Sequence, residues 1–240
     1  MTIFFISDVH LNQENLKSYN LLTKFFNNLP PTTQAIYILG DLFEYWVDDN
    51  INNQFLIEVK QLFQTISNKI SIYFIHGNRD FLIGSIFAKE TNIKILPEFY
   101  KINIYGYNIL LTHGDALMQD KLHYYFSKIM RHPITRLIAK ILPISLKLII
   151  AKQIRNLSKN RFKNNKNQNL YDASQQLIET YLTKYSCNIL IHGHTHQPNV
   201  YNFNIKDKIF TRVVLGDWHD FTHILLFNDH NYKLEKICSN

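Results

Sequence analysis

Five short polar segments, each placed directly after an apolar run rich in β-forming residues, constrain the fold of this chain most strongly. The apolar runs cover residues 3–6, 35–39, 70–75, 109–111 and 189–191. The segments that follow them are Asp8-Val9-His10, Gly40-Asp41, Gly77-Asn78-Arg79-Asp80, His113-Gly114-Asp115 and Gly193-His194-Thr195-His196. Buried strands carry such continuous apolar runs, and open α/β sheets bind ligands at the carboxyl ends of their strands. The pattern therefore predicts one site assembled from several strand ends.

Helical and further strand patterns lie between and after these runs. Residues 55–66 place their apolar side chains on one face of a helix, and a short helix is expected at about 83–90. The runs at 213–215 and 223–227 are expected to be strands of a hairpin or meander in a second sheet. The alternation favours a layered α/β (α+β) fold, and 240 residues suffice for one domain with a sizeable core.

The positive charge of the chain is concentrated in one stretch. Of the 26 Lys and Arg residues, 12 lie between Lys121 and Lys166, where no Asp or Glu occurs. Pro133 and Pro143 divide this stretch into helical pieces that carry apolar and basic residues on separate faces. We therefore expect a single domain over 1–240 with a basic, amphipathic helical cap inserted at about 120–168. The Asn- and Lys-rich residues 159–169 are expected to form a mobile loop.

The composition of the helical stretch indicates its partner. Its apolar runs are interrupted by Lys, so none is long enough to span a bilayer. Apolar faces beside clustered basic charge are typical of interfacial helices, so an anionic membrane surface is the expected partner. Nucleic acid also attracts Lys and Arg, but it is not expected here. Cys187 and Cys238 form neither a disulfide framework nor a metal motif, as expected in a reducing compartment.

The polar segments offer seven nitrogen and oxygen ligands and no thiolate. These are Asp8, His10, Asp41, Asn78, His113, His194 and His196. Such donors suit Mn²⁺, Fe²⁺ or Zn²⁺. Seven ligands are too many for one ion with an open position, but they suit two ions that share a carboxylate, for which Asp41 is the natural candidate. His194 and His196 need a local turn to reach two neighbouring ions. Two divalent ions with two carboxylates leave a positive site that attracts phosphate oxygens.

The order of the five segments resembles that of the calcineurin-like metallophosphoesterase superfamily, from Phe4 to about Trp218. The resemblance implies a two-sheet β-sandwich flanked by helices, with two metal ions. The first ion would be held by Asp8, His10, Asp41 and His196, and the second by Asp41, Asn78, His113 and His194. Many members have His after the Asn, where this chain has Arg79. A guanidinium keeps its proton near neutral pH, so Arg79 cannot be a leaving-group acid, but it is a bidentate donor for phosphate.

Longer motifs restrict the resemblance to one family within this superfamily. They are Gly40-Asp41-Leu42-Phe43-Glu44, Gly77-Asn78-Arg79-Asp80-Phe81-Leu82, Gly193-His194-Thr195-His196-Gln197-Pro198 and Arg212-Val213-Val214-Leu215-Gly216-Asp217-Trp218. These motifs are similar to those of the UDP-2,3-diacylglucosamine pyrophosphohydrolase family of lipid A biosynthesis. The similarity implies hydrolysis of the pyrophosphate of UDP-2,3-diacylglucosamine to UMP and 2,3-diacylglucosamine 1-phosphate, by metal-activated hydroxide attack on the uridine-side phosphorus. It also implies two Mn²⁺ ions, acyl chains held by the helical insertion, and a monomeric, peripheral enzyme at the cytoplasmic face of the bacterial inner membrane.

The same resemblance assigns roles to individual residues. Arg79, Asp41 and Asn78 would be catalytic. The substrate contacts would be Asn78, Arg79, Asp120, Ser158, Lys163, Lys166 and His194. Two other functions stay open at this point. One is a dinuclear-metal nucleotide phosphodiesterase or nuclease, which shares the metals but not the lipid. The other is a metal-binding protein that docks on membranes without catalysis.

Several neighbouring residues have structural explanations. Trp46 and Trp218 are expected in the core. Asp115 and His192 are expected to orient neighbouring ligands. The Arg79 side chain has an alternative role as the ion-pair partner of Asp80 or Glu44.

Overall fold

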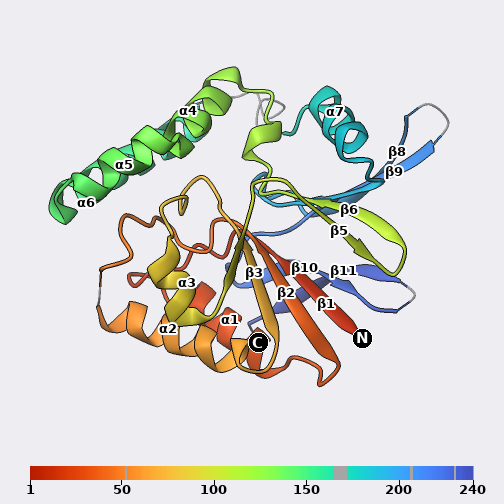
Figure 1. The fold of residues 1–240 in the computed structure, drawn as a ribbon, viewed down its shortest axis with the longest axis horizontal. Coiled ribbons are helices and arrows are strands. Elements are labelled where there is room, and N and C mark those ends of the chain that lie inside the picture. Colours follow the sequence, from red (N-terminus) through yellow and green to blue (C-terminus); the bar gives the residue numbers. More distant parts are fainter. Residues whose placement is uncertain (52, 165–171, 206–207, 230, 240) are drawn as a thin grey trace.

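The chain forms two β-sheets that pack face to face, with helices on their outer faces (Figure 1). The computed structural model describes residues 1–51, 53–164, 172–205, 208–229 and 231–239. All five apolar runs of the sequence are strands. The architecture of two sheets flanked by helices confirms the predicted fold class.

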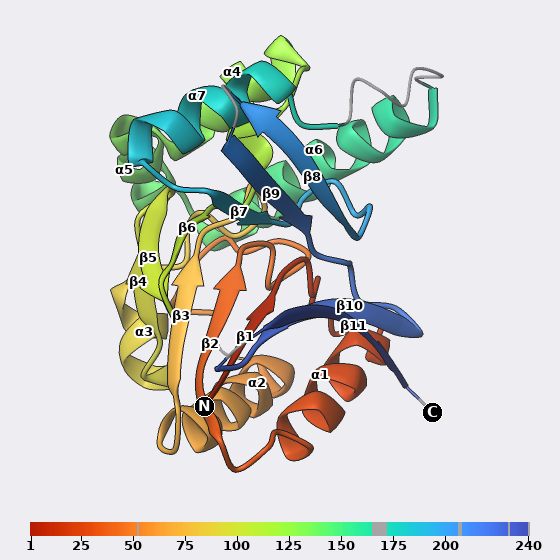
Figure 2. The same cartoon turned by 90° about the vertical axis from the view of Figure 1, so that its right-hand side faces the viewer.

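The first sheet has the strand order β11-β10-β1-β2-β3-β4. Its strands are β1 (Thr2–Ile6), β2 (Thr33–Leu39), β3 (Ser71–Ile75), β4 (Lys94–Leu96), β10 (Phe221–Phe227) and β11 (Tyr232–Cys238). The first four run parallel, because helices α1 (Lys17–Asn27), α2 (Gln54–Ser67) and α3 (Ser85–Thr91) return the chain along one face. Figure 2 shows α1 and α2 in the lower part of the molecule and α3 at its left, beside β4. Their apolar sides, with Leu21, Phe63 and Phe87 fully buried, pack on this face of the sheet.

The second sheet has the strand order β5-β6-β7-β9-β8. Its strands are β5 (Tyr100–Ile104), β6 (Tyr107–Leu111), β7 (Ile189–His192), β8 (Asn199–Ile205) and β9 (Lys208–Val214), and α7 (Gln175–Tyr185) covers its outer face. Between the two sheets lies a core that includes Phe5, Leu39, Ile75, Leu111 and Ile191. The prediction that 213–215 and 223–227 pair in a second sheet is wrong. β9 stays in the second sheet, whereas β10 crosses to the first and pairs with β1 and β11.

The strand ends that carry the polar segments meet at one end of the sandwich. β1, β2 and β3 belong to the first sheet, and β6 and β7 to the second. Hydrogen bonds join the segments within each sheet and between the sheets. The Asp8 N–H donates to the Gly40 carbonyl in the first sheet, and the Gly193 N–H donates to the His113 carbonyl in the second. The His194 N–H donates to Asp8 Oδ2, so the loops of the two sheets meet.

Three helices follow β6 and a 3₁₀ turn (Asp115–Leu117), before the chain returns to α7 and β7. They are α4 (Lys121–Arg131), α5 (Pro133–Ile141) and α6 (Ile144–Asn164), and they project from the sandwich at the upper left of Figure 1. α5 begins at Pro133, where the missing proline N–H costs nothing. Since α6 continues to Asn164, the loop predicted at 159–169 is helical in its first half, and 165–169 lie outside the described residues.

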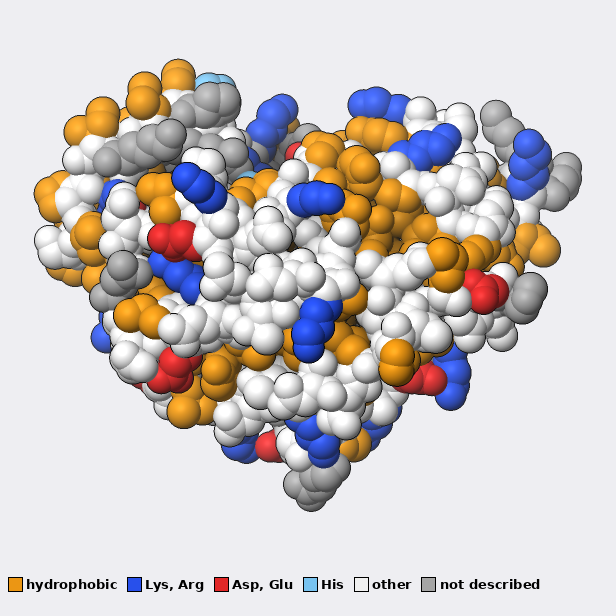
Figure 3. All heavy atoms as spheres, turned by 60° about the horizontal axis from the view of Figure 1, so that its bottom comes forward, with side chains coloured by type: hydrophobic (Ala, Val, Ile, Leu, Met, Phe, Trp, Pro, Cys, Tyr) orange, Lys and Arg blue, Asp and Glu red, His pale blue; other side chains and the backbone are white. Residues whose placement is uncertain are grey.

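The projecting helices turn apolar side chains outward. Ile134, Leu137, Ile138 and Ile141 of α5 are all more than half exposed, as is Leu157 of α6. Hydrophobic side chains accordingly line the outer edge of the lobe at the upper left of Figure 3. None of the described helices combines the length and the apolar character needed to cross a membrane.

Three basic side chains of the same helices turn inward and pair with acidic residues of the sandwich. Lys147 of α6 is buried and contacts the Asp48 carboxylate. Arg155 of α6 contacts Glu44. Arg131 of α4 contacts Asp115 and Glu98. Part of the basic charge that indicated a membrane surface therefore holds these helices on the protein itself.

Candidate metal centre

Backbone conformation marks the candidate ligands before any side-chain contact is considered. Asp8, His10, Asp41, His194 and His196 all have φ between 52° and 67°, in the left-handed region. Non-glycine residues rarely adopt this region, and such strained residues cluster at functional sites. Only three other non-glycine residues in the described part of the chain do so. The turn required between His194 and His196 is thus present.

Two glycines of the motifs allow the loops to approach closely. A Cβ atom on Gly77 would lie 2.0 Å from Asp41 Oδ1. A Cβ atom on Gly193 would lie 2.0 Å from Ser7 Oγ and 2.1 Å from Asp8 Oδ2. Any side chain at either position would displace a carboxylate of the site, so the motifs need glycine there.

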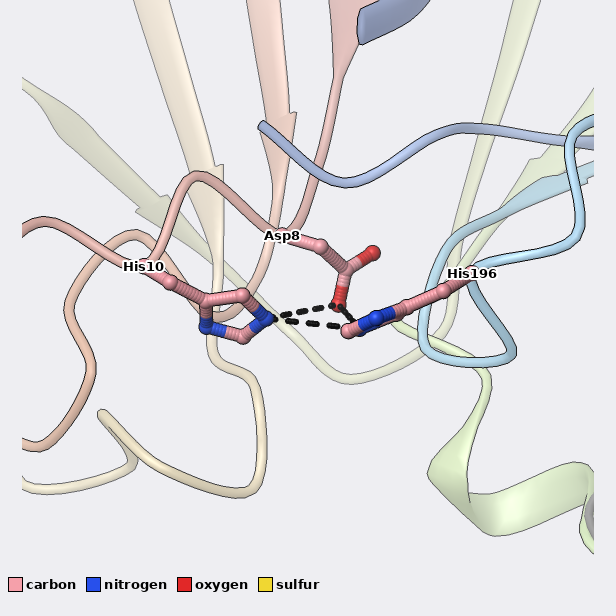
Figure 4. A group of neighbouring side chains, drawn as sticks. All are labelled: Asp8, His10 and His196. Atoms are coloured by element: carbon pink, nitrogen blue, oxygen red, sulfur yellow. Dashed lines mark hydrogen bonds and ion pairs between the residues drawn. The ribbon is translucent and has the colours of Figure 1, made fainter. Parts of the chain in front are cut away.

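One group of ligand atoms consists of Asp8, His10 and His196 (Figure 4). The Nε2 atoms of the two histidines are 3.3 Å apart. Asp8 Oδ1 lies 3.2 Å from His196 Nε2 and 3.9 Å from His10 Nε2. Asp8 and His10 come from the loop after β1, whereas His196 comes from the turn after β7. Three candidate ligand atoms from two sheets therefore converge on one point.

The unsatisfied atoms of this group fit a cation. Asp8 Oδ2 accepts hydrogen bonds from Ser7 Oγ (2.7 Å) and the His194 N–H (2.8 Å), but the buried Oδ1 has no hydrogen-bond partner. Burial alone would raise the pKa of Asp8, yet the charge of His196 lowers it to about 2. Burial likewise opposes a charge on His196, but Asp8 and Asp217 raise its pKa to about 10. A point that stabilises a proton so strongly also favours a metal cation.

A second group consists of Asp41, His113 and His194. His113 Nδ1–H donates to the Leu39 carbonyl (2.8 Å), which directs Nε2 toward the other members. That Nε2 lies 3.1 Å from His194 Nδ1, 3.1 Å from Asn78 Oδ1 and 3.7 Å from Asp41 Oδ1. The structure thus brings together all seven predicted ligands, and it assigns His194 and His196 to different groups.

Arg79 connects the two groups. Its Nε lies 3.2 Å from Asp41 Oδ2, and its NH1 lies 3.1 Å from His10 Nδ1. Its backbone N–H donates to Asp41 Oδ1 (2.9 Å), which fixes the loop. The same NH1 contacts Glu44 Oε2 (2.8 Å), so the pairing with Glu44 exists beside the contacts to the site.

Residues around the ligands hold their loops. Asp80 accepts the Gly77 N–H (2.7 Å) and the Leu42 N–H (2.6 Å), and burial together with the Asp41 charge raises the pKa of Asp80 to about 7. His192 donates from Nδ1 to the Gly193 carbonyl (2.7 Å) and accepts from Arg212 Nε (2.9 Å).

The other predictions have mixed outcomes. Asp115 receives hydrogen bonds from Ser127 and Arg131 of α4, so it holds that helix rather than only orienting a ligand. Asp120 is half-buried just before α4. The side chains of Ser158 and Lys163, and Lys166 as a whole, lie outside the described residues. Trp46 and Trp218 are buried, as predicted.

Some residues of the site carry no assignment from the sequence. Asp217 Oδ2 lies 3.2 Å from His196 Nδ1, and Arg155 reaches Glu44 from α6. Two residues separate Asp217 from the end of β9, so it is a further polar residue at a strand end. No local signal distinguishes Arg155 from the other basic residues of its helix.

Residues 1–198 match the family described as calcineurin-like phosphoesterase. The chain belongs to this family. A solved structure of an archaeal phosphodiesterase has the same fold, with a TM-score of 0.50, 14% identity and coverage of 99% of both chains.

Closer relatives narrow the placement within the calcineurin-like phosphoesterases. A UDP-2,3-diacylglucosamine hydrolase of Haemophilus influenzae (strain PittGG) is 39% identical over 217 residues, which are 90% of each chain. Another, from Vibrio atlanticus (strain LGP32), is 33% identical over 237 residues, 98% of this chain and 97% of the relative. Within its family, the chain groups with the UDP-2,3-diacylglucosamine hydrolases.

Proposed function

We propose that this chain hydrolyses the pyrophosphate bond of UDP-2,3-diacylglucosamine and releases UMP and 2,3-diacylglucosamine 1-phosphate, a step of lipid A biosynthesis. The observation that carries the proposal is the pair of ligand groups with one guanidinium, that of Arg79, touching both. Family membership makes the chain a metal-dependent hydrolase, and the names of its relatives support the substrate.

Two divalent cations, proposed as Mn²⁺, fit the two groups. Asp8, His10 and His196 would hold one with Asp41, and Asp41, Asn78, His113 and His194 would hold the other. The donor set of imidazole, carboxylate and amide oxygen suits Mn²⁺. When bound, such ions polarise phosphoryl oxygens and activate water for attack on phosphorus.

Arg79 binds and orients the pyrophosphate in this proposal. Its Nε and NH1 are engaged by Asp41, His10 and Glu44, whereas its NH2 makes no hydrogen bond to any described residue. A fixed guanidinium stabilises charge that develops on phosphate oxygens. It does not protonate the leaving group, which is acceptable because a sugar phosphate departs without a general acid.

The projecting helices α4–α6 support a lipid substrate and a peripheral position on an anionic membrane. They lie beside the site, since Arg155 of α6 reaches Glu44. Their outward apolar side chains would contact acyl chains or the bilayer interface. We propose that the enzyme acts there, on the cytoplasmic face, as a monomer and without nucleic acid.

Product analysis by mass spectrometry tests the proposal. The purified protein is incubated with UDP-2,3-diacylglucosamine in mild detergent, with Mn²⁺ or with a chelator. UMP and the lipid 1-phosphate are expected only with Mn²⁺. Unchanged lipid beside hydrolysis of a simple phosphodiester would instead support a nucleotide phosphodiesterase. Absence of turnover with every divalent metal would support a metal-binding protein without catalysis.

A further inference from the structure

One carboxylate at the edge of the candidate metal centre holds two guanidinium groups. Glu44 Oε2 accepts from Arg79 NH1 at 2.8 Å, and Glu44 Oε1 accepts from Arg155 Nε at 2.5 Å. The three residues come from the loop after β2, the loop after β3 and helix α6. All three side chains are less than a quarter exposed.

Two guanidinium groups share the Glu44 carboxylate, and of the two only Arg79 contacts a second carboxylate, that of Asp41. Burial lowers the pKa of Arg155, and the charge of Arg79 lowers it further, so the two guanidiniums repel each other. An anion placed between the two guanidiniums would relieve this repulsion.

Arg155 differs from the other inward-facing basic residues in the donors that it leaves available. Lys147 is buried against Asp48, and Arg131 donates to Asp115, Glu98 and the His76 carbonyl. Arg155 uses only Nε for Glu44, and its terminal amino groups make no hydrogen bond to any described residue. A guanidinium has five N–H donors. Arg155 therefore keeps four N–H donors beyond the one that it needs to attach α6 to Glu44.

We propose that Arg155 is a second guanidinium that binds the diphosphate of the substrate, and that Glu44 is a positioning residue that holds Arg79 and Arg155 before the substrate arrives. This inference rests on the proposed function. A diphosphate offers two charged groups, and arginine binds each through bidentate, charge-assisted hydrogen bonds. A simple phosphodiester has one phosphate and would rely on the ligand groups and Arg79.

The test compares Arg155→Gln with two variants of the same helix. Lys152→Gln removes the same charge from an exposed position. Lys147→Gln removes the ion pair with Asp48, which attaches α6 to the sandwich at a point other than Glu44. Arg155→Gln is expected to lower kcat/KM for the nucleotide-lipid about tenfold or more, and to leave kcat/KM for bis(p-nitrophenyl) phosphate within about twofold. Lys152→Gln is expected to leave both values within about twofold.

Calorimetric binding of UDP and UMP separates phosphate recognition from the attachment of α6, because neither nucleotide carries acyl chains. Arg155→Gln should weaken UDP binding about tenfold and UMP binding much less, while Lys147→Gln retains most of the UDP affinity. Arg155→Lys keeps the charge but loses the bidentate geometry, so its UDP affinity should lie between those of Arg155→Gln and the wild type. The inference would be overturned if Arg155→Gln left the UDP affinity unchanged. It would also be overturned if the variant lost kcat/KM equally for the nucleotide-lipid and for bis(p-nitrophenyl) phosphate. If the wild type does not cleave the nucleotide-lipid, the proposed function fails, and the UDP-to-UMP comparison still decides the role of Arg155.

Discussion

Asp217 sets the direction of a histidine proposed to bind metal. Its Oδ2 contacts His196 Nδ1, which leaves His196 Nε2 facing Asp8 and His10. Carboxylates in this position typically strengthen metal binding 10- to 100-fold. We expect Asp217→Asn to weaken Mn²⁺ binding by about that factor in a metal titration. Asp220→Asn is the control, because Asp220 is exposed and pairs with Lys17. Equal metal affinity in the two variants would contradict the assignment.

Arg79 and Asp41 should differ in what their loss removes. Asp41 is a candidate ligand, so we expect Asp41→Ala to lose bound metal and activity together. Arg79 contacts ligands without being one, so Arg79→Ala should keep the metal and lose most turnover, about 10²-fold or more. Metal analysis of the purified variants with kcat measurements checks this. Full loss of metal in Arg79→Ala would defeat the proposed role.

The seven candidate ligands could be predicted from the sequence because each follows a strand, and strand ends converge. The same reasoning reaches Asp217, which follows β9. The same reasoning cannot predict the ion pair between Glu44 and Arg155. These residues are 111 residues apart in the sequence, and only the packing of α6 brings them into contact. Local sequence carries information on periodicity and turn chemistry, whereas such a contact depends on the tertiary arrangement.

At the level of elements, α5 and α6 show what periodicity leaves undecided. Their apolar and basic faces could be predicted, but not which face meets the protein. The structure turns apolar Leu137 outward and basic Lys147 inward, because Asp48 and Glu44 of the sandwich offer partners for the basic side chains. The sheet to which β10 belongs could likewise not be predicted, since the pattern of a strand does not specify its pairing partner.

The attachment of α6 should depend on pH through Asp48. Burial alone would raise the pKa of Asp48, but the hydrogen bond from Lys147 lowers it below 3.8. A lowered folded-state pKa stabilises the fold fully above the unfolded value and less as the pH falls through the folded value. We expect Asp48→Asn to lower the free energy of unfolding at pH 7 by about 1–3 kcal/mol.

Denaturant unfolding at several pH values measures this effect. The difference between the wild type and Asp48→Asn should shrink as the pH falls through the lowered pKa of Asp48, because the carboxylate of the wild type then also becomes protonated. Asp220→Asn, at a fully exposed ion pair, should show no comparable difference at neutral pH. A constant difference across the whole pH range would mean that the charge of Asp48 does not hold α6.

At the scale of the whole molecule, only part of the basic charge is available to an anionic surface. The chain has a formal net charge of +7, yet Arg131, Lys147 and Arg155 are paired with the sandwich. The proposed attraction to an anionic surface would therefore rest on the remaining basic residues, while the outward side chains of α5 and α6 would offer apolar contact. A membrane interaction of this kind should depend on salt only in part.

Vesicle binding tests that combination. Leu137 and Ile141 are 59% and 77% exposed, and burying each at the interface is worth about 1 kcal/mol. Leu137→Ser with Ile141→Ser should therefore lower the partition coefficient on anionic vesicles about 30-fold. Ile209→Ser is the matched control, because Ile209 is 71% exposed on β9, in the second sheet. If the double variant and the control bind vesicles alike, α5 does not contact the bilayer. If high salt abolishes wild-type binding completely, charge alone attracts the protein and the apolar face serves another contact.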